Sequence, residues 1–160
     1  MRVELTINGV PRVFEVPPET RLIDLLREQA GCRSVKRGCE SGDCGACTVL
    51  VDGRPLASCL LLAGQVAGRR ITTVEGLGTP DRPHPLMTAL VEAGAVQCGF
   101  CIPGMILSAK ALLDENPNPT AQDVREALDG HLCRCTGYVK PIEAVLEAAA
   151  RMRVAGEGGR

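Results

Sequence analysis

Eight of the nine cysteines in this 160-residue chain fall into two groups, and their spacing constrains the fold more than any other feature. The first group is Cys39, Cys44, Cys47 and Cys59, and the second is Cys98, Cys101, Cys133 and Cys135. Four thiolates bind one metal centre only if the backbone brings them together. Each group therefore predicts a folded unit built around its own cysteines.

The first three cysteines follow a C-x4-C-x2-C spacing, and the fourth lies further along the chain. This is the arrangement with which plant-type ferredoxins bind a 2Fe-2S cluster. Gly38, Gly42 and Gly45 supply the backbone freedom that a loop with three converging thiolates needs. The spacing is not one of the usual zinc patterns, so it predicts a 2Fe-2S site.

The second group consists of two close pairs that are far apart in sequence. They can meet only if the chain between them folds back as a helical hairpin. An apolar stretch ends at residues 116–119, Asn-Pro-Asn-Pro, and Thr120 with Asp123 then has the pattern of a helix N-cap. The sequence therefore predicts two helices that return Cys133 and Cys135 to Cys98 and Cys101.

Two other uses of cysteine compete with iron–sulfur ligation. Structural zinc sites also use paired cysteines, so the spacing of the second group leaves zinc open there. A disulfide framework fits poorly, because the cysteine count is odd, no signal peptide is visible and the chain is longer than small disulfide scaffolds.

The N-terminal half predicts a compact α+β domain over residues 1–76. Val3, Leu5 and Ile7 alternate with polar residues and lead into an Asn-Gly turn, which predicts a β-hairpin. A helix with apolar residues at positions 22–26 follows and stops near Gly31. The cysteine loop, a second hairpin from Thr48 and a last strand over residues 71–74 come next. This order of elements places one sheet and one helix around the first cysteines.

The C-terminal half predicts an all-α domain. A Gly- and Pro-rich connector over residues 77–84 precedes it, and the domain itself covers residues 85–153. Its four expected helices are Pro85–Ala93, Pro103–Glu115, Thr120–Asp129 and Pro141–Met152. Residues 154–160, which are rich in glycine, are expected to form a flexible tail.

Charge and hydropathy exclude several classes of partner. Eighteen basic and nineteen acidic residues give a net charge of −1, which offers no general attraction for nucleic acid or anionic membrane. No apolar run is long enough for a membrane span. The start at Met1 without an apolar leader, and thiols kept reduced for cluster assembly, predict a cytoplasmic protein.

Three motifs resemble those of a known family. Gly38–Val49, Gln97–Met105 and Cys133–Tyr138 are similar, in this order, to the signatures of the iron–sulfur small subunit of molybdenum hydroxylases. That family includes xanthine dehydrogenase, carbon monoxide dehydrogenase, aldehyde oxidoreductases and hydroxybenzoyl-CoA reductase. The resemblance covers about residues 3–150, and it argues against zinc at the second group.

The resemblance implies a β-grasp ferredoxin-like domain with one 2Fe-2S cluster, followed by a four-helix domain with another. It implies electron transfer between molybdopterin on a large partner subunit and FAD on a medium partner subunit. It also implies a heterotrimer or a dimer of heterotrimers, with no catalytic residue on this chain. In the family, the glutamine that matches Gln97 contacts molybdopterin, whereas the residue alone predicts only a surface position at a helix start.

Two residues lie close to the motifs but outside the ligand pattern. Cys32 is expected to be a small buried residue rather than a fifth ligand, and His131 to be a solvated or helix-end histidine.

Two other functions compete with that of a subunit in a complex. One is a free two-cluster ferredoxin, which the near-neutral charge disfavours, and the other is a zinc-stabilised interaction module without a redox role.

Overall fold

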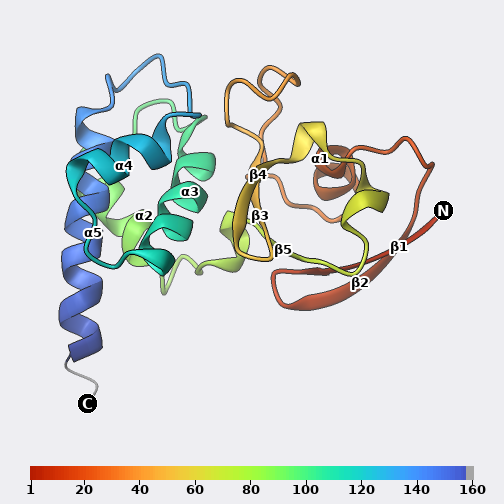
Figure 1. Cartoon of the computed structure of the whole chain (residues 1–160), viewed down its shortest axis with the longest axis horizontal. Helices are drawn as coiled ribbons and strands as arrows, with labels where there is room; N and C mark the ends of the chain where they lie inside the picture. Colours follow the sequence, from red (N-terminus) through yellow and green to blue (C-terminus); the bar gives the residue numbers. More distant parts are fainter. Residues whose placement is uncertain (158–160) are drawn as a thin grey trace.

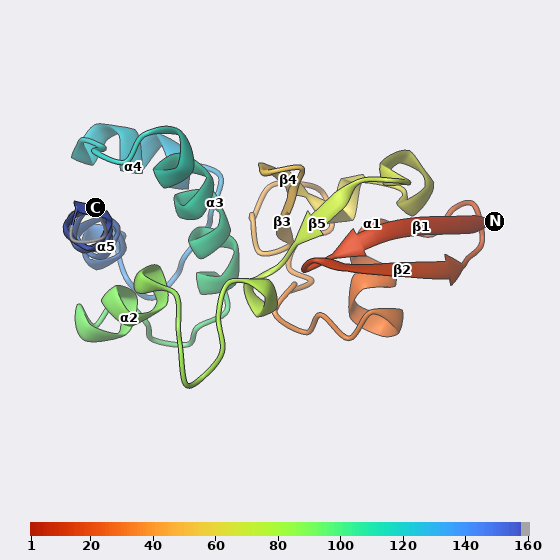
Figure 2. The ribbon, with the colours of Figure 1, turned by 90° about the horizontal axis from the view of Figure 1, so that it is seen from below.

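The computed structural model describes residues 1–157 and divides them into a β-sheet lobe and a helical lobe (Figure 1). The N-terminus lies at the outer end of the sheet lobe, and the long helix α5 (Val139–Glu157) lies at the opposite side of the molecule. Figure 2 shows that α3 (Ile102–Glu115) is the helix next to the sheet lobe. This architecture confirms the predicted α+β class with a second, helical domain.

Two hairpins and one further strand form the sheet, with β1 (Arg2–Ile7), β2 (Val10–Glu15), β3 (Thr48–Val51), β4 (Arg54–Ala57) and β5 (Arg70–Thr72). The strand order is β2-β1-β5-β3-β4, in which only the β1–β5 pair is parallel. Asn8 and Gly9 have φ angles of 51° and 82°, as the predicted hairpin turn requires. The last strand ends earlier than predicted, because Val74 begins a 3₁₀ turn (Val74–Gly76).

A short helix covers the sheet. Helix α1 (Leu22–Asp24) continues as a π-helical turn (Leu25–Gln29), and the 3₁₀ turns Ser58–Leu60 and Ala63–Val66 connect β4 to β5. The apolar side chains of α1 and its π-helical turn are fully buried in the same core cluster as Cys47 and Cys59. Burial of apolar area contributes roughly 25 cal/mol per Å². The first core and the first cysteine group are therefore one structural unit.

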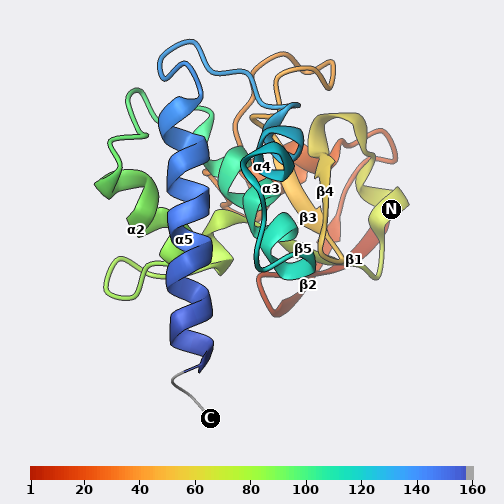
Figure 3. The same cartoon turned by 60° about the vertical axis from the view of Figure 1, so that its left-hand side comes forward.

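Four helices form the second lobe, namely α2 (Pro85–Glu92), α3, α4 (Ala121–Leu128) and α5. All four predicted helices are confirmed, with starts within two residues of those observed. Thr120 is the N-cap of α4, because its hydroxyl accepts from the Asp123 amide at 3.2 Å and the Asp123 carboxylate accepts from the Thr120 amide at 2.7 Å. Figure 3 shows α5 running along the outer side of the lobe beside α2.

Helix α5 is longer than the sequence indicated. It continues through residues 154–157, which were assigned to a flexible tail, and residues 158–160 lie outside the described residues. Val154 and Ala155 extend the helix, and Gly156 is tolerated there because a single glycine costs a helix only about 1 kcal/mol. None of the helices in residues 1–157 is long and apolar enough to cross a membrane.

Apolar side chains join the two lobes. Leu50 of β3 packs against Leu107 and Ala111 of α3, and all three are buried. Val74, near the end of the predicted first domain, and Leu77, the first residue of the predicted connector, pack against this group and also against the helical core. The chain is thus packed between the lobes where the connector begins, which holds the sheet and α3 together.

Glu75 binds this part of the chain to the segment that precedes the first cysteine loop. Its carboxylate accepts from the Ser34 amide at 2.9 Å and from the Thr73 hydroxyl at 2.6 Å. Burial raises the pKa of the Glu75 carboxyl, but the hydrogen bonds from Ser34 and Thr73 outweigh it and hold that pKa below its usual value of 4.5. The ionised carboxylate therefore stabilises the folded state.

We predict that Glu75→Gln lowers the free energy of unfolding at pH 7 by about 1 kcal/mol, a value reduced for solvent exposure. Because the folded pKa lies below the unfolded one, the stabilisation is complete above pH 4.5 and is lost as pH falls through the folded pKa. Urea unfolding at pH 7 and in acid measures this, with the exposed Glu19→Gln as the control. An equal loss at both pH values would contradict the assignment.

Candidate metal centres

The structure brings the first four cysteines together. Cys39 and Cys44 lie in the loop before β3, Cys47 immediately precedes β3, and Cys59 lies in the turn after β4. Ser58 links the two segments, because its amide and its hydroxyl both donate to the Cys47 carbonyl, at 3.3 and 2.7 Å. The β3–β4 hairpin thus positions the fourth cysteine beside the third.

Backbone amides surround the sulfur of Cys39. This sulfur accepts from the N–H groups of Ser41, Asp43 and Cys44 at 3.3 to 3.4 Å. The Ser41 side chain, and then the Ser41 and Cys44 amides, lower the pKa of Cys39 to about 6. A loop that stabilises a thiolate suits an iron ligand, because the thiolate is the ligating form and N–H···S bonds help to set a cluster's reduction potential.

The loop glycines are required by its geometry. Gly42 and Gly45 have φ angles of 87° and 71°, in the left-handed region that favours glycine. A Cβ on Gly38 would lie 2.6 Å from the Cys44 sulfur, a separation that real Cβ atoms do not show. The predicted need for backbone freedom is confirmed at Gly42 and Gly45, whereas Gly38 is required by the close approach of the Cys44 sulfur.

The second four cysteines lie at the N-terminal end of α3 and in the loop between α4 and α5. Cys101 is the N-cap residue of α3, and Cys98 precedes it in the chain. Helix α4 packs against α3 and leads to the loop that contains Cys133 and Cys135. The predicted helical hairpin is confirmed, and it returns the second pair to the first.

The eight sulfurs are arranged as four interacting pairs, which are Cys39 with Cys44, Cys47 with Cys59, Cys98 with Cys135, and Cys101 with Cys133. A 2Fe-2S cluster takes four thiolates, two on each iron. Zinc instead needs its ligands around one point. The close sulfur pairs fit a two-iron centre at each group, with two thiolates on each iron.

In two of the pairs, burial and the neighbouring thiol oppose the ionisation of one member. Burial, and then the neighbouring Cys47, raises the pKa of Cys59 to about 11. Burial, and then the neighbouring Cys133, raises the pKa of Cys101 to about 12. Two thiolates side by side repel each other, so a bound cation is needed to hold both in the ligating form. The donor set therefore fits iron.

Two further residues position Cys133. Burial raises the pKa of the Cys133 thiol, but the Thr136 hydroxyl and amide outweigh it and bring the pKa to about 7. Those two groups donate to the Cys133 sulfur, at 3.1 and 3.4 Å. The Cys133 amide in turn donates to the Tyr138 hydroxyl at 2.8 Å. The sequence analysis assigned no role to Thr136 or Tyr138 beyond their place in a motif.

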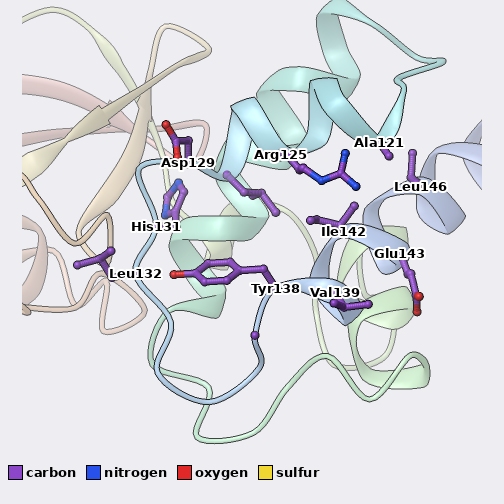
Figure 4. Close-up of a pocket in the computed structure, with 12 residues that line it drawn as sticks. Ala121, Arg125, Asp129, His131, Leu132, Tyr138, Val139, Ile142, Glu143 and Leu146 are labelled. Carbon is purple, nitrogen blue, oxygen red and sulfur yellow. The ribbon is translucent and has the colours of Figure 1, made fainter.

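Tyr138 has a φ angle of 69°, which is uncommon for a residue with a side chain. Its ring lines a hollow of about 640 Å³ between α4 and α5 and extends toward the segment that bears Leu132 (Figure 4). Leu132 and Val139 also line this hollow and are 63% and 61% exposed. The hydrogen bond from the Cys133 amide to the Tyr138 hydroxyl holds Tyr138 in this backbone conformation, which is costly in itself.

His131 differs from its prediction. It was expected to be a solvated or helix-end histidine. It does follow the end of α4, where its amide donates to the Leu128 carbonyl at 3.0 Å, but it is only 5% exposed and its Nε2 lies 2.7 Å from the Ser108 hydroxyl on α3. The reason is tertiary, because Gly45 of the first cysteine loop covers the ring. Burial lowers the pKa of His131 to about 4, although the Gly45 carbonyl opposes this, so the ring is neutral at pH 7.

Gln97 and Cys32 have simple surroundings. The Gln97 side-chain amide donates to the Cys135 carbonyl at 3.1 Å, which links it to the second cysteine set. Cys32 is 4% exposed and belongs to the apolar core of the sheet lobe, as predicted. Burial raises the pKa of its thiol. Cys32 is therefore a core residue and lies outside the four sulfur pairs.

The fold and the paired thiols define a two-domain iron–sulfur protein. Two family models agree, one described as a 2Fe-2S iron-sulfur cluster binding domain over residues 5–70 and one as a 2Fe-2S binding domain over residues 73–146. The nicotinate dehydrogenase small FeS subunit of Eubacterium barkeri is 51% identical, over 93% of this chain and 95% of its own length.

Solved structures give the same result. Quinoline 2-oxidoreductase from Pseudomonas putida 86 has a chain that matches with a TM-score of 0.92 and 48% identity, over 98% of both chains. Aldehyde oxidoreductase from Desulfovibrio desulfuricans matches with a TM-score of 0.93 and 48% identity, but this chain spans only 17% of its length. The chain belongs to the iron–sulfur small subunits of the molybdenum hydroxylase family, whose role is electron transfer.

We predict that Thr136→Val lowers the reduction potential of the centre in the helical lobe and leaves the other unchanged. Negative charge on the sulfurs grows on reduction, so a lost O–H···S bond worth about 1 kcal/mol shifts a one-electron potential by about 40 mV. A redox titration followed by electron paramagnetic resonance (EPR) measures both potentials. Thr136→Ser keeps the hydroxyl and is the matched control. An unchanged potential in Thr136→Val would show that this bond has no effect on the centre.

Proposed function

We propose that this chain passes electrons between a molybdopterin centre on a large partner subunit and FAD on a medium partner subunit. The observation that most supports this is the set of four sulfur pairs in two adjoining lobes. Iron–sulfur clusters accept and release electrons without substrate chemistry of their own. Two such centres in one rigid chain provide a path between two partners.

We assign Cys39, Cys44, Cys47 and Cys59 as the ligands of the first 2Fe-2S cluster, within a domain at residues 1–76. We assign Cys98, Cys101, Cys133 and Cys135 as the ligands of the second, within a domain at residues 85–153. The contacts within each set and the core that contains Cys47 and Cys59 support this division. So do the ranges of the two family models.

Substrate chemistry belongs to the large partner in this proposal. The relatives are named for nicotinate, quinoline and aldehyde, yet they match this chain at similar identities of 48 to 51%. A chain that is about equally similar to chains of enzymes named for such different compounds does not itself select the substrate. We therefore propose no catalytic residue on this chain and leave the reacting compound to its partner.

We propose that Gln97 lies at the contact with the molybdopterin-binding subunit. The side-chain nitrogen of Gln97 donates to the Cys135 carbonyl, and its side-chain oxygen can accept a second hydrogen bond. A partner group that donates to this oxygen would be linked through Gln97 to the second cysteine set. Phe100, Leu132 and Val139 are 45 to 63% exposed. Exposed apolar side chains close to such a centre are typical of a protein contact surface.

We further propose a heterotrimer, or a dimer of heterotrimers, in the cytoplasm. The eight paired cysteines fit a compartment that keeps thiols reduced for cluster assembly. Expression of the chain with its genomic neighbours, followed by gel filtration, tests the assembly. Co-elution with molybdenum and flavin supports the proposal, whereas a stable monomer that exchanges electrons freely would favour a free two-cluster ferredoxin.

We predict that Cys135→Ser reduces the iron content from about four to about two atoms per chain and removes one cluster signal. The signal of the first set persists, because its ligands lie in the other lobe. Cys32→Ser makes the same chemical change at a buried cysteine outside the pairs, and both signals should remain. Loss of both signals in Cys135→Ser would contradict the ligand assignment by lobe.

A further inference from the structure

The two cysteine sets meet at one contact between the lobes. The Leu132 amide donates to the Cys44 carbonyl at 3.0 Å. Since Leu132 immediately precedes Cys133, this bond joins a residue of the first set to the neighbour of a residue in the second. Among residues 1–157 it is the one backbone hydrogen bond between the two cysteine loops.

His131 lies beside this bond, buried between the lobes. Its Nε2 pairs with the Ser108 hydroxyl at 2.7 Å, whereas its Nδ1 is buried without a hydrogen-bond partner. The Gly45 carbonyl is close enough to act on the ring, but not in hydrogen-bond geometry. A buried polar atom without a partner costs about 1–3 kcal/mol, so its presence calls for a reason other than stability.

Glycines allow the lobes to approach so closely. A Cβ on Gly104 of α3 would collide with the Gly45 carbonyl oxygen and lie 3.1 Å from His131 Nδ1. A Cβ on Gly38 would lie 3.6 Å from the Phe100 ring, which lies between two cysteines of the second set. Only the approach of Gly104 to Gly45 leaves no room for a side chain, because 3.6 Å is an ordinary van der Waals distance.

We propose that His131 is a positioning residue. Its ring is held by Ser108 between Gly45 and Gly104. The ring in turn fixes the Leu132–Cys44 hydrogen bond and, with it, the separation of the two cysteine sets. This rests on the proposed function, because it takes both sets to hold clusters. In each transfer, one site loses an electron and is oxidised, and the other site gains that electron and is reduced. No bond forms or breaks and no proton moves, so a fixed separation and a direct link are what this chain contributes.

A substitution at Gly104 tests this interface specifically. Gly104→Ala favours the helix locally but forces the Gly45 carbonyl away, which should break the Leu132–Cys44 bond. Gly156→Ala makes the same change in α5, where a Cβ meets nothing within 4 Å, and is the matched control. Ser108→Ala releases the ring of His131 without adding an atom. All variants are made in the full chain with its partners and clusters.

Three measurements distinguish positioning from folding. Iron and sulfide per chain report assembly, hydrogen exchange of the Leu132 amide reports the bond, and magnetic interaction between the two reduced centres reports their separation. We expect Gly104→Ala and Ser108→Ala to keep full iron and sulfide, to lose protection of the Leu132 amide and to change the magnetic interaction. Gly156→Ala should match the unmodified chain in all three.

Unchanged protection and unchanged magnetic interaction in both interface variants would overturn the proposal. Loss of iron from Ser108→Ala would also overturn it, because His131 would then act in cluster assembly rather than in positioning. Failure of the proposed function is a separate result, since it would appear as the absence of two centres in the unmodified chain.

Discussion

Contact between paired cysteine sulfurs is the constraint on which the rest of the structure depends. In each set, one pair joins segments separated by a complete supersecondary unit, so that Cys47 meets Cys59 across the β3–β4 hairpin and Cys101 meets Cys133 across the α3–α4 hairpin. Burial and mutual repulsion make these pairs unfavourable as free thiolates. A bound metal removes that penalty, so folding of both lobes is coupled to cluster binding.

The features that could be predicted from the sequence are those with a local cause. The cysteine spacing predicted the two groups of four, because few backbone paths bring four thiols together, but it did not predict the pairs within each group. The capping box at Thr120 and the Asn8-Gly9 turn predicted element boundaries, because their hydrogen bonds and φ angles are set by neighbouring residues. The fold class and the two-domain order followed from these signals.

Two features that the sequence did not predict have tertiary causes. His131 is buried by Gly45, which is distant in sequence, so no local pattern distinguished it from a solvated histidine. The bond between Tyr138 and Cys133 depends on a positive φ at a residue that is not glycine, and nothing local specifies that conformation. The extent of α5 has a local cause, because Val154 and Ala155 continue the helix and the single glycine at position 156 costs it only about 1 kcal/mol.

The interface between the lobes bears directly on the proposed electron transfer. Leu50, Leu107 and Ala111 form its apolar part, and the His131 contact forms its polar part beside the cysteines. An apolar part alone would hold the lobes together, but it would not specify how the cysteine loops face each other. In the proposed function, this interface would hold the two centres in a constant relation to each other, whichever substrate the partner acts on.

The central claim is that each cysteine set holds its own two-iron centre. EPR spectroscopy of the unmodified, anaerobically purified and fully reduced chain tests it most directly. Two distinguishable signals are expected, each integrating to about one unpaired electron per chain, as two reduced 2Fe-2S clusters require. A single signal, or none, in material with intact protein would contradict it.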